Sequence, residues 1–154
     1  MPDDLIVRVA ERRDLDALLK LYPHLNPDDP PLASAAADRI WDQFLRYPGS
    51  AIFLGLIGEK PVTTCTLVVV PNLTRGGAPY GLIENVVTDA GHRNNGFGQA
   101  VLRAAIAAAW QQQCYKVMLL TGSTDPATLR FYREVGFEQN KTGFQIRQIP
   151  PRDS

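Results

Sequence analysis

Residues 86–102 read VVTDAGHRNNGFGQAVL, and the fold and the candidate site both depend on this stretch. A β-branched run ends at Thr88, a polar turn follows, and an alanine-rich helical segment begins near Gly96. Glycines at the start of a helix leave backbone N–H groups accessible at the positive end of the helix dipole. The turn at residues 93–98 is therefore predicted to bind an anion such as a phosphate or diphosphate, against the simpler interpretation of a tight structural turn.

Length and composition predict one soluble globular domain spanning residues 1–154. Sixteen basic side chains balance 16 acidic ones, so net charge predicts neither a nucleic-acid nor a membrane partner. The N-terminal residues do not have the pattern of a signal peptide, and no stretch approaches the roughly 20 apolar residues of a membrane span. A cytoplasmic location is expected. Cys65 and Cys114 have no metal-binding spacing and are expected to be reduced and structural, so no metal is predicted.

Apolar periodicity and turn residues predict a mixed α/β fold, a central sheet with helices on both faces. The predicted order is β-α-α-β-β-β-α-β-α-β. Expected strands are residues 5–10, 50–58, 62–70, 80–88, 115–121 and 137–149. Expected helices are residues 13–21, 34–47, 96–113 and 126–135. Ile40, Phe44 and Tyr47 are expected to form the apolar stripe of the second helix, and Asp125 and Gly136 to cap the last one.

Two familiar phosphate-binding patterns fail at the glycine turn. Gly91 and Gly96 have the spacing of a P-loop, but Phe97 and Gly98 occupy the positions that require Lys and Ser or Thr. A dinucleotide-binding turn would need a third glycine where Val101 lies, and a βαβ unit where the strands predict an antiparallel meander.

A third pattern, Arg/Gln-x-x-Gly-x-Gly/Ala, fits residues 93–98 fully, and residues 131–137 read FYREVGF. Taken alone, the second segment could be the end of an amphipathic helix, with Phe131 and Val135 as an apolar pair. Together the two motifs resemble the hallmarks of the GNAT N-acetyltransferase superfamily, in the expected order and on the expected elements. The resemblance covers essentially the whole chain. It implies an acetyltransferase that uses acetyl-CoA as co-substrate.

The resemblance also implies which residues contact coenzyme A. The backbone of a bulged strand would bind pantetheine and the acetyl carbonyl, and the irregular apolar pattern before Thr88 is consistent with a bulge. A family asparagine that contacts the coenzyme is replaced here by Asp125, whose role could be capping alone. The implied coenzyme-binding residues are Val86, Val87, Thr88, Arg93, Asn94, Asn95, Gly96, Phe97, Gly98, Asp125 and Phe131.

Acetyl transfer to an amine needs a base, an oxyanion donor and a proton for the departing thiolate. An amine with a pKa near 10.4 is neutral in only about one molecule in 10³ at pH 7, so a base or a water relay helps. Glu84 is the candidate base, with an exposed strand carboxylate as the alternative interpretation. The N–H near Val86 is the candidate oxyanion donor, and Tyr132 matches the family's general acid. Transfer would be direct, within a ternary complex.

The acceptor is predicted to be a small primary amine. Segments around Glu84, Cys114 and Phe144 are similar to glucosamine-6-phosphate N-acetyltransferases, which implies Glu84, Asn85 and Arg147 as acceptor-binding residues. Asn85 and Leu120 each stand where that group has an aspartate, and Arg147 could equally be a solvated strand residue. The proline-rich residues 22–32 are expected to cover the acceptor and to order on binding. A homodimer is expected by family analogy, and a non-catalytic CoA-binding sensor or a protein-acetylating enzyme remain alternatives.

Overall fold

The computed structural model describes residues 4–150 and divides them into two compact units, one ending at Leu119 and one beginning at Leu120. The first unit holds a five-stranded sheet in the order β1-β2-β3-β4-β5. The strands are β1 (Leu5–Val9), β2 (Ala51–Ile57), β3 (Lys60–Val70), β4 (Tyr80–Thr88) and β5 (Val117–Met118). The helices of this unit are α1 (Leu15–Leu21), α2 (Ser34–Phe44) and α3 (Phe97–Gln111). The second unit contains α4 (Pro126–Val135).

The sheet is mixed, as the sequence predicts. The pairs β1–β2, β2–β3 and β3–β4 are antiparallel. β5 pairs with β4 in parallel, through Gly81 and Leu82 of β4. The β2–β3 hairpin turns at Gly58, whose φ of 59° lies in the left-handed region that suits glycine. The parallel pairing of β5 is short, so the strand expected at residues 115–121 is reduced to two residues.

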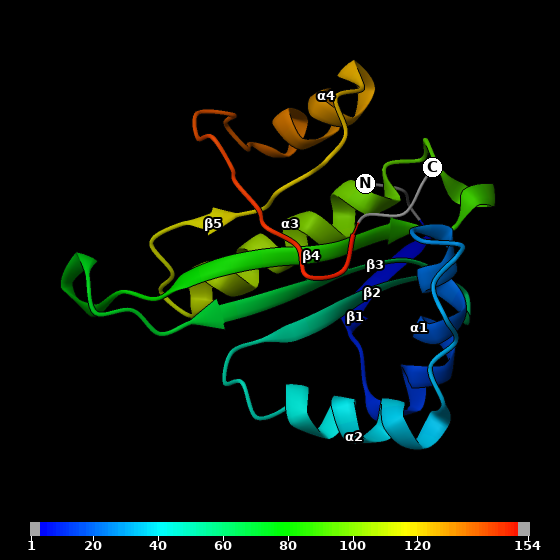
Figure 1. Cartoon of the computed structure of the whole chain (residues 1–154). Coiled ribbons are helices and arrows are strands. Elements are labelled where there is room, and N and C mark those ends of the chain that lie inside the picture. The colour runs from blue at the N-terminus through cyan, green and yellow to red at the C-terminus, as the bar shows by residue number, and fades with distance from the viewer. Residues whose placement is uncertain (1–3, 151–154) are drawn as a thin grey trace. The chain divides into compact units, whose positions relative to one another are not determined.

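The two faces of the sheet carry separate apolar clusters, because successive side chains of a strand point to opposite faces. Figure 1 shows α3 on one face and α1 and α2 on the other. The cluster against α1 and α2 consists of Ala10, Leu18, Leu21, Trp41, Leu54, Leu56 and Val87. The cluster against α3 consists of Leu5, Val62, Phe97 and Ala100. The expected helices on both faces are confirmed.

The stripe expected on the second helix is wrong. Ile40 and Tyr47 are 48% and 53% exposed, whereas Ala37 and Trp41 are buried. Trp41 brings a larger apolar surface into the α1–α2 cluster than Ile40 could, and this orients the helix. The helix also ends at Phe44 rather than at Tyr47.

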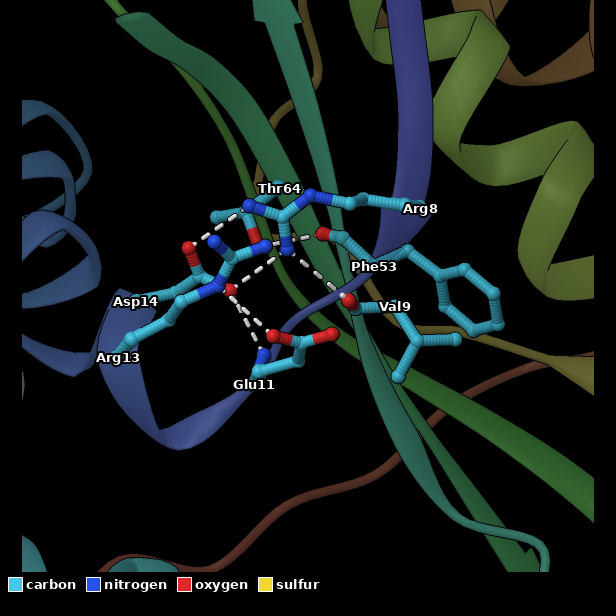
Figure 2. Close-up of polar contacts among 7 residues, drawn as sticks. All are labelled: Arg8, Val9, Glu11, Arg13, Asp14, Phe53 and Thr64. Carbon is cyan, nitrogen blue, oxygen red and sulfur yellow. Dashed lines mark hydrogen bonds and ion pairs between the residues drawn. The ribbon is translucent and has the colours of Figure 1, made fainter. Parts of the chain in front are cut away.

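The turn from β1 into α1 is fixed by a partly buried ion pair (Figure 2). The Arg8 guanidinium donates to both carboxylate oxygens of Asp14, at 2.7 and 2.9 Å. Asp14 also accepts from the backbone N–H of Glu11 at 2.7 Å. These bonds, the one from Arg8 first, lower the pKa of Asp14. Figure 2 also shows the Thr64 hydroxyl, which donates to the carbonyl of Phe53 at 2.7 Å and so ties β3 to β2.

In the second unit the capping residues of the last helix are confirmed. The Asp125 carboxylate accepts from the N–H of Ala127 at 2.9 Å, and Pro126 takes the first helical position. Gly136 ends the helix with a φ of 116°. The strand expected at residues 137–149 is wrong, because the described part of this segment, residues 137–150, has neither helix nor strand.

Along residues 4–150, none of the helices combines the length and the apolar character that crossing a bilayer would require.

Candidate functional site

The predicted bulge lies in β4, beside the motif turn. Thr64 pairs with Val87 and Thr66 pairs with Glu84, so Asn85 and Val86 together stand opposite Cys65. Such an extra residue interrupts the ladder and leaves backbone N–H and C=O groups that β3 does not pair. The bulge begins at Asn85, one residue earlier than the segment expected to bind coenzyme. Asn85 has a φ of 52°, a conformation that asparagine tolerates better than most residues.

Side chains of the bulged strand differ in exposure. Glu84 and Asn85 are exposed, Val86 and Thr88 are half-buried, and Val87 is buried among the residues of the α1–α2 cluster. Glu84 is thus accessible to solvent and to a ligand. Glu84 immediately precedes the bulged residues Asn85 and Val86, which keeps it a candidate for the base.

Buried threonine hydroxyls hold the end of β4. Thr63 donates to the carbonyl of Val87 at 3.0 Å, and its oxygen lies 3.0 Å from the hydroxyl oxygen of Thr88. The N–H of Asp89 donates to the carbonyl of Val62 at 2.8 Å, just beyond the strand. These bonds fix the point from which the motif turn departs.

The motif turn has the geometry of an anion-binding loop. Asn94 and Gly96 both adopt left-handed conformations, with φ values of 65° and 76°. Gly96 is the N-cap of α3, and no atom lies within 4 Å of the position that a Cβ would take. The loop is therefore open at its glycine, and the helix dipole directs its positive end there. These features fit a diphosphate.

Two side chains stabilise the loop from within. The Asn95 amide donates to the carbonyls of His92 and Arg93 at 3.1 and 3.2 Å. Phe97 is buried in the α3 cluster and anchors the start of the helix. Residues 93–96 are exposed, whereas Phe97 and Gly98 are buried.

A cluster of side chains that no sequence motif marks lies at the entrance to this loop. His24 is the last residue of the 3₁₀ turn η2 (Tyr22–His24). Asp89 precedes the turn η4 (Ala90–His92), and His92 is its last residue. Both imidazoles contact the Asp89 carboxylate, His24 through Nε2 at 3.1 Å and His92 through Nδ1. A lone loop histidine would ordinarily be incidental, and only the fold shows that His24 reaches a residue 65 positions away along the chain.

In the second unit, Tyr132 lies between two other aromatic residues of its motif. Its ring meets the rings of Phe131 and Phe137 edge-on, with centroids 5.0 and 6.1 Å apart. The Arg147 guanidinium donates to the carbonyl of Ile149 at 3.0 Å. Tyr132 is half-buried and Arg147 is exposed.

The cysteines have the environment of structural thiols. Both are free and buried. Burial raises the pKa of Cys65 to about 12, and burial also raises the pKa of Cys114. A thiol that stays protonated is a poor nucleophile, which disfavours an acyl-cysteine intermediate. In residues 4–150 no group of three or more His, Cys, Asp or Glu side chains is placed to hold a metal ion.

Comparison with known proteins defines the class of this chain. The model of the acetyltransferase (GNAT) family matches residues 18–137, a match that runs across both units. Glucosamine 6-phosphate N-acetyltransferase of Trypanosoma brucei brucei is 32% identical over 93% of this chain and 95% of its own length. A solved structure named "Putative acetyltransferase", from Agrobacterium tumefaciens, is 52% identical, with a TM-score of 0.88 over 93% of this chain and 99% of that one.

A second solved structure, an acetyltransferase of Trypanosoma brucei, is 31% identical with a TM-score of 0.82, over 94% of this chain and 99% of that one. These similarities identify an acyltransferase. The chain belongs to the acetyltransferase (GNAT) family, whose members use acetyl-CoA.

Proposed function

We propose that this protein transfers the acetyl group of acetyl-CoA directly to the primary amine of a small molecule, within a ternary complex. The observation that supports this most is the arrangement in the first unit. There, the bulge at Asn85 and Val86 is followed, after the motif turn, by the start of α3. The N-cap of that helix is Gly96, which leaves the backbone open. Family membership supports the same reaction.

The coenzyme would be held mainly by backbone. The N–H groups of residues 93–98 would surround the diphosphate, and those of residues 86–88 would bind pantetheine and the acetyl carbonyl. Asp125 and Phe131 are assigned to the coenzyme from the motif alone. Because the proposed contacts to the diphosphate are main-chain groups, the glycines matter more than the charge of the loop.

In the proposed reaction the amine nitrogen bonds to the acetyl carbon while the bond from carbon to sulfur breaks. Glu84, directly or through water, accepts the proton that the amine loses. The N–H near Val86 donates to the carbonyl oxygen as negative charge develops on it. Tyr132 supplies a proton or a hydrogen bond to the departing thiolate, and regains any lost proton from solvent.

We propose an amino-sugar phosphate as the first acceptor class to test, on the strength of the glucosamine 6-phosphate N-acetyltransferase similarity. Glu84, Asn85 and Arg147 would bind this acceptor, with the Arg147 guanidinium on its phosphate. A second class, protein N-termini, is favoured by 30% identity to human N-alpha-acetyltransferase 30, although that match covers 60% of this chain and 25% of that protein.

The test is a thiol-release assay with acetyl-CoA against a panel of amines. The panel pairs glucosamine 6-phosphate with glucosamine, so that the phosphate is the only difference, and adds a polyamine, an aminoglycoside and a peptide with a free N-terminus. We expect glucosamine 6-phosphate to release thiol fastest. Preference for the peptide would assign the second class, and coenzyme binding without thiol release from any amine would favour the non-catalytic sensor.

We further propose that residues 1–154 act as one domain, that the protein works in the cytoplasm and that it forms a homodimer. The family match across both units supports the first proposal. Light scattering at several protein concentrations tests the dimer, and a mass equal to one chain of 17.0 kDa at every concentration would refute it.

A further inference from the structure

The segment that follows α1 is anchored at both ends of its 3₁₀ turn. At the first end, Tyr22 packs against the α1–α2 cluster, and its hydroxyl hydrogen-bonds with Thr66 on β3. Burial raises the pKa of Tyr22, so the phenol stays protonated. Thr66 pairs with Glu84, the residue just before the bulge. The turn is thus fixed to the sheet beside the proposed reaction site.

At the second end, His24 is fixed in one tautomer by the groups around it. The backbone N–H of Ala90 donates to Nδ1 at 3.1 Å. A backbone N–H can only donate, so Nδ1 carries a lone pair and the proton is on Nε2. Nε2 then donates to the Asp89 carboxylate at 3.1 Å. One imidazole therefore holds both the backbone and the side chain at the start of η4.

Asp89 is suited to accept from two imidazoles. The hydrogen bond from His92 lowers its pKa first, and the nearby His24 and Lys60 act in the same direction. The carboxylate is therefore ionised at neutral pH and has lone pairs for both rings.

The contact is reciprocal, because the motif loop also reaches back to η2. The Arg93 guanidinium donates to the carbonyl of His24 at 3.0 Å and to the carbonyl of Thr88 at 3.3 Å. Its cation is thus used to connect backbone segments, and Arg93 is the first residue of the proposed diphosphate loop. A shift of residues 89–93 would move every N–H group that follows.

We propose that His24 is a positioning residue for coenzyme A, which sets the start of the diphosphate loop through Ala90 and Asp89. This inference rests on the proposed function. A loop that is already held in its binding conformation loses less entropy when the ligand binds, so the His24 contacts contribute to affinity without touching the coenzyme. The imidazole is 32% exposed, so its removal should leave the apolar clusters intact.

The test compares coenzyme A affinity by calorimetry in the wild type and in His24→Ala, with steady-state kinetics alongside. Loss of these hydrogen bonds should weaken coenzyme binding about tenfold. We expect KM for acetyl-CoA to rise with it, while kcat at saturating acetyl-CoA stays near the wild-type value. Lys20→Ala, an exposed change in the last turn of α1, is the matched control and should alter neither.

Two rescue variants separate the two halves of the contact. His24→Asn keeps an acceptor near the Nδ1 position, and His24→Gln keeps a donor near the Nε2 position, so each should recover part of the affinity. If His24 only stabilised the fold, variants of equal stability would bind coenzyme A equally well, and neither His24→Asn nor His24→Gln would recover affinity over His24→Ala.

Ala90→Pro approaches the same bond from the other side, because proline has no N–H to donate to His24. Ala90 is the first residue of η4, and Asp89 before it has φ −49° and ψ 132°, which a residue preceding proline adopts readily. We expect Ala90→Pro to weaken coenzyme binding, and the double variant with His24→Ala to be no weaker than the worse single variant.

The inference would be overturned if folded His24→Ala bound coenzyme A within about twofold of the wild-type affinity. That change is smaller than the least effect expected for one lost hydrogen bond. The inference would also be overturned if the losses of affinity from His24→Ala and Ala90→Pro added up in the double variant. A wild-type protein that binds no coenzyme A would instead refute the proposed function, and calorimetry on the wild type therefore comes first.

Discussion

At the scale of single residues, the candidate site depends on backbone conformations that only some side chains allow. Asn85 and Asn94 hold left-handed conformations that are uncommon for residues other than glycine. Such conformations are retained where the surrounding structure requires them, often at functional sites. In this chain Asn85 lies in the bulge and Asn94 in the proposed diphosphate loop, whereas Arg75 and Gln113 hold the same conformation in other turns.

Asn85→Val should be destabilising, because a β-branched residue strongly disfavours the φ of 52° at this position. We expect a loss of about 1–2 kcal/mol in the free energy of unfolding, measured by urea denaturation. Asn85→Gly is the control and should retain stability, since glycine adopts this conformation freely. If the valine variant were as stable as the glycine variant, the bulge would not impose this conformation.

Tyr132→Phe removes only a hydroxyl, and the edge-on contacts with Phe131 and Phe137 survive because the ring remains. If the hydroxyl serves the thiolate, kcat should fall by about 10²-fold, the lower end for a general acid. Coenzyme A affinity, measured by calorimetry, should stay unchanged. An unaltered kcat would remove Tyr132 from the catalytic residues and would suit the sensor alternative.

At the scale of secondary-structure elements, local chemistry predicted both ends of α4 but failed for the last expected strand. Asp125, Pro126 and Gly136 bound α4 as predicted, because caps act within a few residues of the chain. The strand expected at residues 137–149 failed. Phe144 and Ile146 alternate with polar residues but are 90% and 100% exposed, and the described residues of the second unit contain no strand to pair with them. Alternation of apolar and polar residues predicts that one face of a strand could be buried, but it does not show which strand pairs with it.

The junction of β1 and α1 should carry a pH-dependent part of the stability. The pKa of Asp14 is lowered in the folded protein, first by the hydrogen bond from Arg8, so its contribution is present above its unfolded pKa. That contribution is lost as the pH falls through the folded value, below about 4. Asp14→Asn should therefore cost about 1–3 kcal/mol at neutral pH, because it leaves the partly buried Arg8 without its counter-ion.

Urea denaturation of wild type and Asp14→Asn at several pH values checks this. The difference in unfolding free energy should shrink as the pH is lowered below about 4. Asp16→Asn, an exposed change in the first turn of α1, is the matched control and should show a small difference at every pH. A constant gap for Asp14→Asn across the range would show that the ion pair does not supply the stability.

At the scale of the whole molecule, the sequence allowed the architecture and the motif turn to be predicted, but not the contacts between distant segments. The sheet, its bulge and the start of α3 follow from patterns within about ten residues, where periodicity and turn chemistry act. The contact of His24 with Asp89 joins segments that only the folded chain brings together. The same limit applies to α2, where Trp41 packs in a cluster with residues of the sheet and Ile40 is exposed, a difference that the apolar pattern of the helix alone did not predict.

Coenzyme binding should also be visible as a change in the stability of the whole molecule. A ligand that binds only the folded state at 100 times its Kd adds about 2.7 kcal/mol to the unfolding free energy. For a chain of 154 residues this corresponds to a rise in Tm of about 5–10 °C in a thermal-shift measurement.

Pantetheine, which lacks the diphosphate, is the control ligand. If the open helix start at Gly96 supplies the affinity, pantetheine at the same concentration should raise Tm much less than coenzyme A. Equal shifts from the two ligands would place the affinity at the bulge instead, and no shift from coenzyme A would argue against the anion loop altogether.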